Sequence, residues 1–238
     1  MTSVLVTRPR EDSDQLAGEL ARLGFEVMLE PLMHIHFFED VEINLNDTQG
    51  LLFTSANGVR AFAKASSTRT LPAYCVGSAT AKEAKTQGFI KIHTADGDVD
   101  KLAQLIAAKC DRLAGNLYHA AASELAGDLE FLLTAKGFKY RRAILYEAIH
   151  TESLTDQSIK AIMAEKVDAV LLFSPRTARG FVENLKAADL IDKCKNLSLF
   201  CLSLNVKNEI MAYDWRLVET ADTPNQQVLL KLLKEKMG

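Results

Sequence analysis

Short apolar runs alternate with helical patterns along most of the chain. Ser3–Thr7 is apolar and rich in β-branched residues, which predicts a strand. In Asp12–Leu23, leucines recur at the spacing of one helix face, and Glu26–Leu29 starts the next predicted strand. Regular alternation of strands and helices favours parallel sheets that are covered by helices on both faces.

The dipeptide Gly-Phe ends several of the predicted helices. It occurs at Gly24-Phe25, Gly88-Phe89 and Gly137-Phe138, each time before a predicted strand. A glycine just past the end of a helix, followed by an apolar residue, is a typical helix-ending signature.

One strand-to-helix segment occurs twice, at residues 51–62 and 170–181. Ser55 corresponds to Ser174 at an offset of 174 − 55 = 119. Each copy reads as an apolar strand, then a serine that can cap a helix, then the helix. A hydroxyl at a helix N-terminus after a buried strand is suited to bind an anion. Two such segments indicate two similar domains that bind one anionic ligand.

Other segments repeat with different offsets, which indicates that the units are permuted. Leu16–Phe25 aligns with Leu129–Phe138 at an offset of 138 − 25 = 113. Residues 74–77 resemble residues 200–203. The unit with the N-terminal strand and helix is therefore equivalent to the unit at Asn116–Phe138, and the two serine-containing units are equivalent to each other.

The chain is expected to cross between the two domains twice. Residues 34–38 and 144–150 alternate apolar and polar side chains, which is typical of a half-exposed antiparallel ladder. We therefore predict an α/β fold in which a two-stranded antiparallel ladder joins two parallel-sheet domains. The predicted boundaries are residues 1–33 and 153–238 for domain 1, 43–143 for domain 2, and 34–42 and 144–152 for the hinge.

Composition and charge limit the class of function. The chain has 238 residues, 48% hydrophobic and 25% charged, as is ordinary for a globular protein of one or two domains. Its net charge of −3 argues against a nucleic-acid binder that relies on a basic surface.

Met1–Val6 is too short for a signal peptide, and the uncharged run Asn196–Val206 is too short for a membrane span. Cys75 and Cys201 lie in apolar runs, which indicates buried thiols and a reducing cytoplasm.

The usual catalytic motifs are missing. The chain lacks the glycine-rich dinucleotide and P-loop motifs, the hydrolase Gly-x-Ser-x-Gly and the zinc-protease His-Glu-x-x-His. Residues 96–100 (DGDVD) begin like a calcium loop, but Lys101 and Ala107 stand where glycine and glutamate are needed. We interpret these residues, like Asp12 and Asp14, as helix starts, and we predict no metal site.

The histidines are interpreted as surface or interdomain residues rather than catalysts, because none has a carboxylate or serine at a diagnostic spacing. They are His34, His36, His93, His119 and His150.

Several polar residues follow predicted strands, where open α/β sheets bind ligands. Arg8 can pair with a carboxylate, or it can be a solvated arginine in a turn. Gly77 would let the backbone approach a ligand and Thr80 offers a hydroxyl, or both can belong to an ordinary helix cap. Tyr146 lies in the second ladder strand and could donate a proton to a leaving group, or it can be an ordinary strand tyrosine.

Four segments, taken in order, resemble uroporphyrinogen-III synthase. They are residues 7–9 (TRP), 53–62 (FTSANGVRAF), 76–81 (VGSATA) and 173–176 (FSPR). The resemblance covers essentially the whole chain and rests on the order and spacing of the motifs together. It implies two Rossmann-like domains joined by the ladder, an active site in the cleft, and neither a metal nor an organic cofactor.

The resemblance also implies the reaction. The family closes the linear tetrapyrrole hydroxymethylbilane with loss of water and inverts the last ring, which gives uroporphyrinogen III. Uncatalysed closure gives the type I isomer, so the enzyme acts chiefly by positioning. Helix N-termini, hydroxyls and a few arginines can bind the carboxylates of this substrate without a basic surface.

The site residues that the resemblance implies are one catalyst and a set of binding residues. Tyr146 matches the ladder tyrosine that assists departure of the hydroxyl. The turn expected at His119–Ser123 lacks the usual glycine and basic residues, so it should bind weakly or lie outside the cleft. The implied partners are the substrate and, transiently, hydroxymethylbilane synthase, with the chain a monomer. The residues expected to bind substrate are Arg8, Ser55, Ala56, Asn57, Gly77, Thr80, Ser174, Arg176 and Asn205.

Two alternatives stay open. One is a non-catalytic two-domain binding protein that closes on a small anion, against which the missing signal peptide counts. The other is a two-domain glycosyltransferase-like enzyme, which would need acidic metal ligands where this chain has predicted helix starts.

Overall fold

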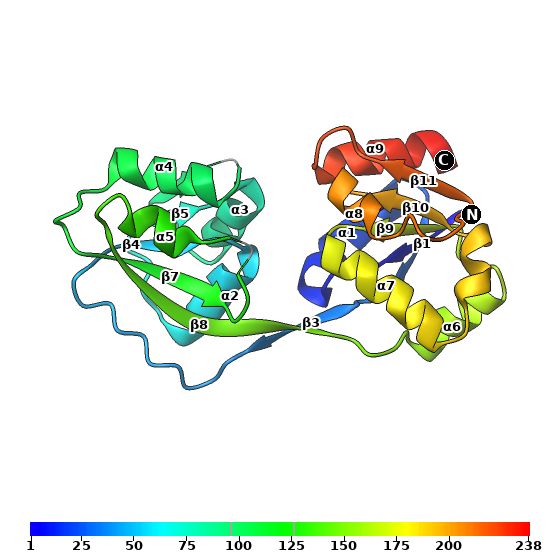
Figure 1. Cartoon of the computed structure of the whole chain (residues 1–238), viewed down its shortest axis with the longest axis horizontal. Coiled ribbons are helices and arrows are strands. Elements are labelled where there is room, and N and C mark those ends of the chain that lie inside the picture. Colours follow the sequence, from blue (N-terminus) through cyan, green and yellow to red (C-terminus); the bar gives the residue numbers. More distant parts are fainter. Residues whose placement is uncertain (96, 126) are drawn as a thin grey trace. The chain divides into compact units, whose positions relative to one another are not determined.

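The structure, a computed structural model, describes residues 1–95, 97–125 and 127–238. Contacts between Cα atoms divide the chain into two compact units. Unit 1 consists of Met1–His34 and Ile149–Gly238, and unit 2 consists of Ile35–Ala148. Both chain termini belong to unit 1 (Figure 1).

Unit 1, all of whose residues are described, contains a five-stranded parallel sheet with helices on both faces (Figure 1). Its elements are β1 (Ser3–Val6), α1 (Arg10–Arg22), β2 (Glu26–Leu29), α6 (Asp156–Met163), β9 (Ala169–Leu172), α7 (Pro175–Ala187), the 3-10 helix η1 (Ile191–Asn196), β10 (Ser198–Cys201), α8 (Leu204–Asn208), β11 (Leu217–Thr220) and α9 (Gln226–Met237). The strand order is β11-β10-β9-β1-β2. Leu5 packs with α6, α7 and α8, whereas Val4 and Val6 pack with α1 and α9 on the other face.

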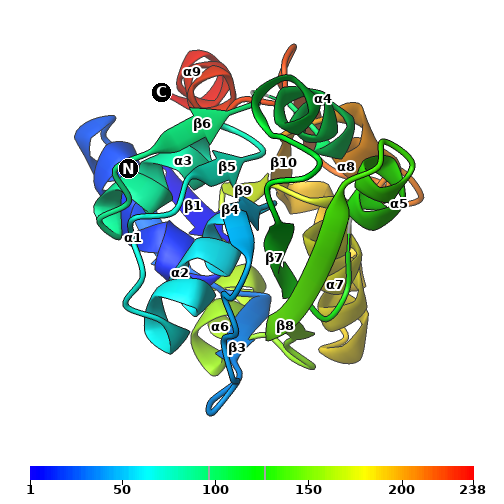
Figure 2. The same ribbon diagram turned by 90° about the vertical axis from the view of Figure 1, so that its left-hand side faces the viewer.

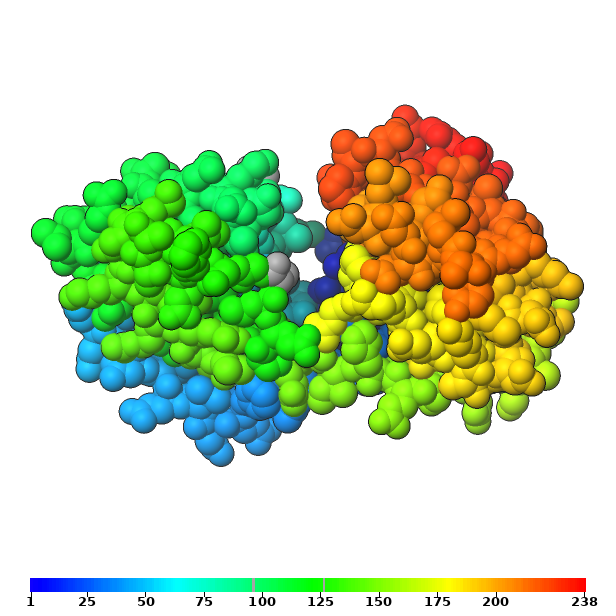
Figure 3. Space-filling model, viewed as in Figure 1, coloured from blue at the N-terminus to red at the C-terminus, as the bar shows by residue number. Residues whose placement is uncertain are grey.

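The described part of unit 2 contains a six-stranded sheet of order β3-β8-β7-β4-β5-β6. Its elements are β3 (Met33–Phe37), β4 (Thr48–Phe53), α2 (Ala56–Ala65), β5 (Ala73–Cys75), α3 (Ser78–Thr86), β6 (Ile92–Thr94), α4 (Val99–Lys109), β7 (Asn116–Ala122), α5 (Leu129–Thr134) and β8 (Lys139–His150). Leu51 and Phe53 pack with α2 and α3, whereas Leu52 packs with α4 and α5 on the other face. In Figure 2, β7 and β8 run side by side, and Figure 3 shows the surface that α4 and α5 form together.

The two sheets share one strand order after permutation. Strands β11, β10, β9, β1 and β2 of unit 1 correspond in place to β6, β5, β4, β7 and β8 of unit 2. The predicted correspondence between the serine-containing copies, with β9 equivalent to β4, is therefore confirmed. The predicted correspondence between the N-terminal strand β1 and β7 is confirmed as well.

The sequence offsets also reproduce the strand register. Val6 and Leu171 are register partners in unit 1. The offset of 113 converts Val6 into His119, and the offset of 119 converts Leu171 into Leu52. His119 and Leu52 are register partners in unit 2. The internal repeat therefore holds at the level of single residue pairs.

A salt bridge between helices is duplicated too. Arg60 of α2 binds Glu83 of α3 at 3.0 Å, and Arg179 of α7 binds Glu209 of α8 at 2.8 Å. The arginines are related by the offset of 119, and the glutamates by the offset of 126 that relates β5 to β10. The repeat thus extends from the strands to the packing of the helices that follow them.

The Gly-Phe signatures end helices as predicted. Gly24, Gly88 and Gly137 have φ angles of 90°, 89° and 83°, in the left-handed region that favours glycine. Each is followed by a buried phenylalanine whose N–H bonds to the carbonyl five residues earlier, at 3.0 to 3.1 Å. This geometry satisfies a helix carbonyl and turns the chain toward the next strand.

Strands β3 and β8 form the antiparallel ladder that the sequence predicts. The N–H of Phe38 bonds to the carbonyl of Leu145 at 2.9 Å, and the N–H of Thr151 bonds to that of Leu32 at 3.1 Å. Residue numbers therefore rise on one strand as they fall on the other. The chain leaves unit 1 in β3 and returns to it in β8. The predicted domain and hinge boundaries stay predictions.

Two strand ends differ from the sequence prediction. β7 continues to Ala122 instead of turning at His119, because Ala120 and the alanine after it are buried and pair with β8. β8 begins at Lys139 rather than Arg142, since it pairs with β7 from that strand's first residue.

Gly24 and Gly18 allow a matched test of the helix end. A Cβ on Gly24 would meet nothing within 4 Å, so Gly24→Ala changes the backbone strain alone and should lower the free energy of unfolding by about 1 kcal/mol. In Gly18→Ala, within α1, the new Cβ would come no closer than 3.9 Å to a neighbour, and the free energy of unfolding should rise by about 0.5–1 kcal/mol. Urea unfolding measures both; shifts of the same sign would contradict this account.

Candidate functional site

The described residues of unit 2 form a pocket at the carboxyl ends of the strands. It encloses about 350 Å³, within the usual range for small-molecule sites. Thr54 and Ser55 line it after β4, Val76 lines it after β5, and His119 and Tyr146 line it from β7 and β8. Carboxyl ends of parallel strands are where α/β proteins bind ligands, so this pocket is the candidate site.

Ser55 and Tyr146 form a short hydrogen bond in the pocket, with 2.5 Å between Oγ and Oη. Ser55 also caps α2, because its Oγ accepts a hydrogen bond from the N–H of Gly58 at 3.1 Å. Tyr146 is 6% exposed, and this burial raises the pKa of its phenol, while the hydrogen bond with Ser55 acts to lower that pKa. Tyr146 is therefore protonated at neutral pH and able to donate.

Gly58 gives α2 and Tyr146 the room for this arrangement. A Cβ at Gly58 would lie 2.6 Å from the carbonyl oxygen of Ala120 and 3.8 Å from Cε1 of Tyr146. Any side chain there would push α2 away from β7. The glycine is thus required by close packing rather than by a special φ angle.

The copy in unit 1 has a different partner for its serine. Ser174 caps α7 by accepting from the N–H of Thr177 at 3.1 Å, and its Oγ lies 2.8 Å from Oγ1 of Thr177. Thr177 Oγ1 also contacts Sδ of Met33, which the offset of 113 aligns with Tyr146. The capping serine therefore pairs with its own helix in unit 1 and with a phenol from another strand in unit 2.

A second polar chain lies in the wall of the pocket. His119 Nε2 lies 3.0 Å from Thr54 Oγ1, and His119 Nδ1 lies 2.6 Å from Tyr140 Oη. His119 is 1% exposed, so its interpretation as a surface residue was wrong. Burial, and secondarily the charge of Arg142, lower the pKa of His119 to about 4. The ring is neutral at pH 7, so one nitrogen donates and the other accepts.

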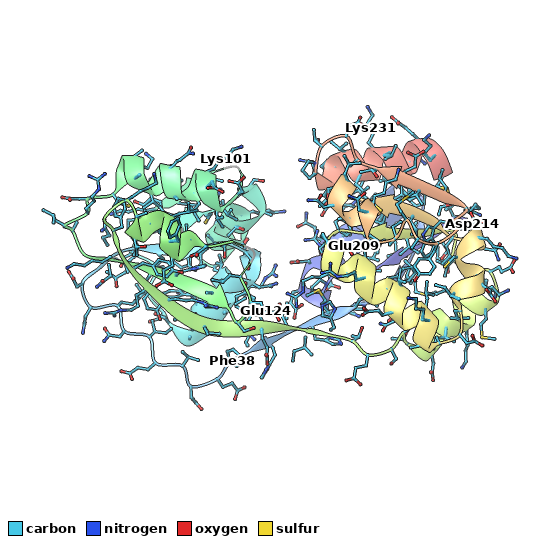
Figure 4. All side chains as sticks on the ribbon, in the orientation of Figure 1. Phe38, Lys101, Glu124, Glu209, Asp214 and Lys231 are labelled. Atoms are coloured by element: carbon cyan, nitrogen blue, oxygen red, sulfur yellow. The ribbon has the colours of Figure 1, made fainter. Side chains whose placement is uncertain are left out.

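Two carboxylates also line the pocket. Asp98 caps α4 by accepting from the N–H of Lys101 at 3.0 Å, which confirms that part of the predicted helix start. Asp96 of the same segment lies outside the described residues. The second carboxylate is that of Glu124, which follows β7 and is labelled in Figure 4. The pocket thus contains hydrogen-bond acceptors as well as hydroxyl donors.

The other predicted residues of unit 2 lie in the turns and helix starts that follow the strands. Ala56 and Asn57 begin α2, and Asn57 Oδ1 accepts from a guanidinium of the same helix at 2.7 Å. Gly77 precedes α3, and a Cβ there would meet nothing within 4 Å, so packing does not require a glycine. Thr80 lies in the first turn of α3 and is 4% exposed.

In unit 1, Arg8 follows β1 and is held in place by its neighbours. Its guanidinium donates to Gln226 Oε1 at 2.9 Å and to Asp12 Oδ2 at 3.2 Å. It also lies 4.8 Å from the centre of the Phe173 ring. These contacts fix the direction of Arg8 at the carboxyl end of the sheet.

The remaining predicted residues of unit 1 also follow strands. Arg176 lies in the first turn of α7, after Ser174, and its Nε lies 3.3 Å from His150 Nε2. Asn205 lies in the first turn of α8 and is exposed.

Sequence reasoning missed Thr54, His119 and Glu124 as residues of the pocket. Thr54 is a polar residue directly after a buried strand, which is a usable signal. His119 stands between Tyr118 and Ala120 in an otherwise apolar run, a pattern typical of a buried polar group. Glu124 gives no signal, because the sequence predicts an earlier end for β7.

Two absences hold for the described residues. Within residues 1–95, 97–125 and 127–238, no group of three or more His, Cys, Asp or Glu side chains could hold a metal ion. No described helix combines the length and apolar character that a membrane span requires. Cys75 and Cys201 are fully buried, as predicted, and burial raises the pKa of both thiols to about 12.

Fold and site together define a duplicated α/β protein with a pocket at the carboxyl edge of one sheet. The family model described as Uroporphyrinogen-III synthase HemD matches residues 14–231. The chain therefore belongs to the uroporphyrinogen-III synthase family, as the sequence resemblance indicated.

Curated relatives carry related names. The chain is 26% identical over 249 residues to the porphyrin biosynthesis protein HemD of Ruminiclostridium josui, covering 98% of this chain and 48% of that protein. It thus spans about half the length of that relative. It is 24% identical over 205 residues to the uroporphyrinogen-III synthase of Chlorobaculum parvum, covering 81% of this chain and 82% of that one.

Solved structures share the fold. The uroporphyrinogen-III synthetase from Helicobacter pylori matches with a TM-score of 0.69 at 16% identity, over 99% of both chains. A mutant uroporphyrinogen III synthase from Thermus thermophilus matches with a TM-score of 0.52 at 13% identity, over 99% of this chain and 98% of that one. These likenesses confirm the predicted fold class.

The lowered pKa of His119 predicts an acid-sensitive stability. Above pH 6.5 the ring is neutral in the folded and the unfolded state, and below it only the unfolded state takes up the proton until about pH 4. From pH 7 to pH 5 this should cost about 2 kcal/mol of folding stability. Urea unfolding of the wild type and of His119→Gln at both pH values measures the difference. Equal losses in the two proteins would contradict the prediction.

Proposed function

We propose that this chain catalyses the closure of hydroxymethylbilane to uroporphyrinogen III, with loss of water and inversion of the last ring. The observation that supports this most directly is the Ser55–Tyr146 pair in the pocket of unit 2. A buried, protonated phenol at the carboxyl edge of a sheet is suited to assist a leaving group. Family membership and the name of the Chlorobaculum parvum relative support the choice of reaction.

In the proposed reaction the substrate hydroxyl needs a proton to depart as water. The electron-rich pyrrole expels the hydroxyl, and Tyr146 donates to the departing oxygen. Ser55 Oγ accepts from Gly58, so its own proton is available to the oxygen of Tyr146. The phenol proton is then left for the substrate. This direction agrees with the effect of Ser55, which lowers the pKa of Tyr146.

We propose that different parts of the site bind the carboxylates and the pyrrole N–H groups of the substrate. N–H groups at the start of α2 and nearby hydroxyls suit its carboxylates, because helix N-termini favour anions. Asp98 and Glu124 suit its pyrrole N–H groups, which need acceptors. The residues proposed to bind substrate are Ser55, Ala56, Asn57, Gly77 and Thr80 of unit 2, and Arg8, Ser174, Arg176 and Asn205 of unit 1.

We further propose a cytoplasmic monomer that receives its substrate in transient contact with hydroxymethylbilane synthase. Spontaneous closure to the type I isomer competes with the enzyme, so a short free lifetime of the substrate favours the correct product. The buried thiols are compatible with a reducing compartment. The net charge of −3 supports the exclusion of nucleic acid as a ligand.

Product analysis tests the function. The chain is supplied with hydroxymethylbilane, the products are oxidised, and the porphyrin isomers are separated. We expect type III from the chain and type I from a reaction without protein. Type I alone, formed at the spontaneous rate, would overturn the proposal and favour a non-catalytic binding protein.

Tyr146→Phe tests the leaving-group role. We expect kcat to fall by about 10²-fold with KM little changed, because the ring stays and only the donor is lost. Tyr118→Phe is the matched control: Tyr118 is 2% exposed on the neighbouring strand β7 and should keep its activity within about twofold. Full activity in Tyr146→Phe would remove the role of the phenol but not the function.

A further inference from the structure

We propose that Thr54 donates a hydrogen bond to a carboxylate of the substrate. His119 and Tyr140 are positioning residues that direct the hydroxyl proton of Thr54 into the pocket. We call these three residues the hydroxyl relay. The identity of the ligand rests on the proposed function, whereas the geometry of the relay does not.

The relay runs from the half-buried Tyr140 on β8, through the buried His119 on β7, to the pocket wall. Thr54 and His119 line the pocket, and Thr54 stands next to Ser55 at the end of β4. The distances are 3.0 Å from Thr54 Oγ1 to His119 Nε2 and 2.6 Å from His119 Nδ1 to Tyr140 Oη. The pocket end of the relay is therefore a hydroxyl, and its far end is a phenol.

The protons of the relay have one consistent direction. A phenol is a stronger donor than a neutral imidazole, and 2.6 Å is typical of an O–H donor, so Tyr140 donates to Nδ1. Nε2 then carries the ring proton and donates to Thr54 Oγ1. No member of the relay accepts the hydroxyl proton of Thr54. Because Thr54 lines the pocket, this proton is available to an acceptor bound there.

Unit 1 shows that the fold does not need the relay. The offset of 119 places Phe173 on Thr54, and the offset of 113 places Val6 on His119 and Val27 on Tyr140. In unit 1 these three residues pack in one hydrophobic cluster. Burial of a polar network costs free energy that a hydrophobic cluster avoids. The presence of the relay in unit 2, beside the pocket, therefore points to a role in binding.

The relay complements the Ser55–Tyr146 pair. Adjacent residues, Thr54 and Ser55, each belong to a hydrogen-bond chain that ends in one hydroxyl proton directed to the same pocket. The phenol is assigned to the departing hydroxyl, which leaves the Thr54 donor for a second acceptor. The carboxylates of the linear tetrapyrrole are the strongest acceptors that this substrate class offers.

The tautomer of His119 tests the relay without any assay of activity. In protein labelled with 15N-histidine, the ring nitrogen shifts at pH 7 should show a neutral His119 with its proton on Nε2. In Tyr140→Phe the donor to Nδ1 is lost, and the proton should move in part to Nδ1. A proton on Nδ1 in the wild type would overturn the proposed direction.

Kinetics with hydroxymethylbilane test the role of Thr54. Thr54→Val should raise KM about tenfold with kcat within about twofold, and Thr54→Ser should restore most of the affinity. Tyr140→Phe should raise KM about threefold alone and have no further effect in Thr54→Val. An unchanged KM in Thr54→Val, or effects of the two changes that multiply, would overturn the inference.

The outcomes separate the inference from the proposed function. If the wild type yields only the type I isomer, the proposed function fails, and the His119 tautomer still decides the relay. If the wild type yields type III but Thr54→Val keeps its KM, only the inference fails.

Discussion

The hydrogen bond of 2.5 Å between Ser55 and Tyr146 is the interaction on which the candidate site depends. It joins the N-cap residue of α2 to strand β8, so it links a helix cap to the ladder. It requires a glycine at position 58, because a Cβ there would lie 2.6 Å from the carbonyl oxygen of Ala120. The close packing of α2 on β7 thus sets the distance between the capping hydroxyl and the phenol.

The internal duplication separates what the fold needs from what the site needs. Both units share strand order, register, capping serines and a salt bridge between the following helices. They differ where unit 2 has its pocket: Gly58 and Tyr146 stand where unit 1 has Thr177 and Met33, and the hydroxyl relay stands where unit 1 is apolar. Shared features are explained by folding, and the differences by the role that we propose for the pocket of unit 2.

Much of the fold could be predicted because it is written in local patterns. Helix ends follow from glycines that adopt a positive φ, and strand register follows from the repeat offsets. The site was predicted only in part, because its hydrogen bonds join residues that are distant in sequence. Thr54 and His119 are 65 positions apart, and their contact depends on the register of β4 and β7. The alanines at the end of β7 give no periodic signal, so only pairing with β8 reveals that the strand continues.

We propose that Ser55 directs the proton of Tyr146 to the leaving hydroxyl. The most direct measurement is the single-turnover rate of water loss from hydroxymethylbilane in Ser55→Ala, Tyr146→Phe and the double variant. We expect both single variants to be slow and the double variant to be no slower than Tyr146→Phe, because Ser55 acts through the phenol. A Ser55→Ala rate equal to that of the wild type, or a double variant in which the two losses multiply, would contradict this proposal.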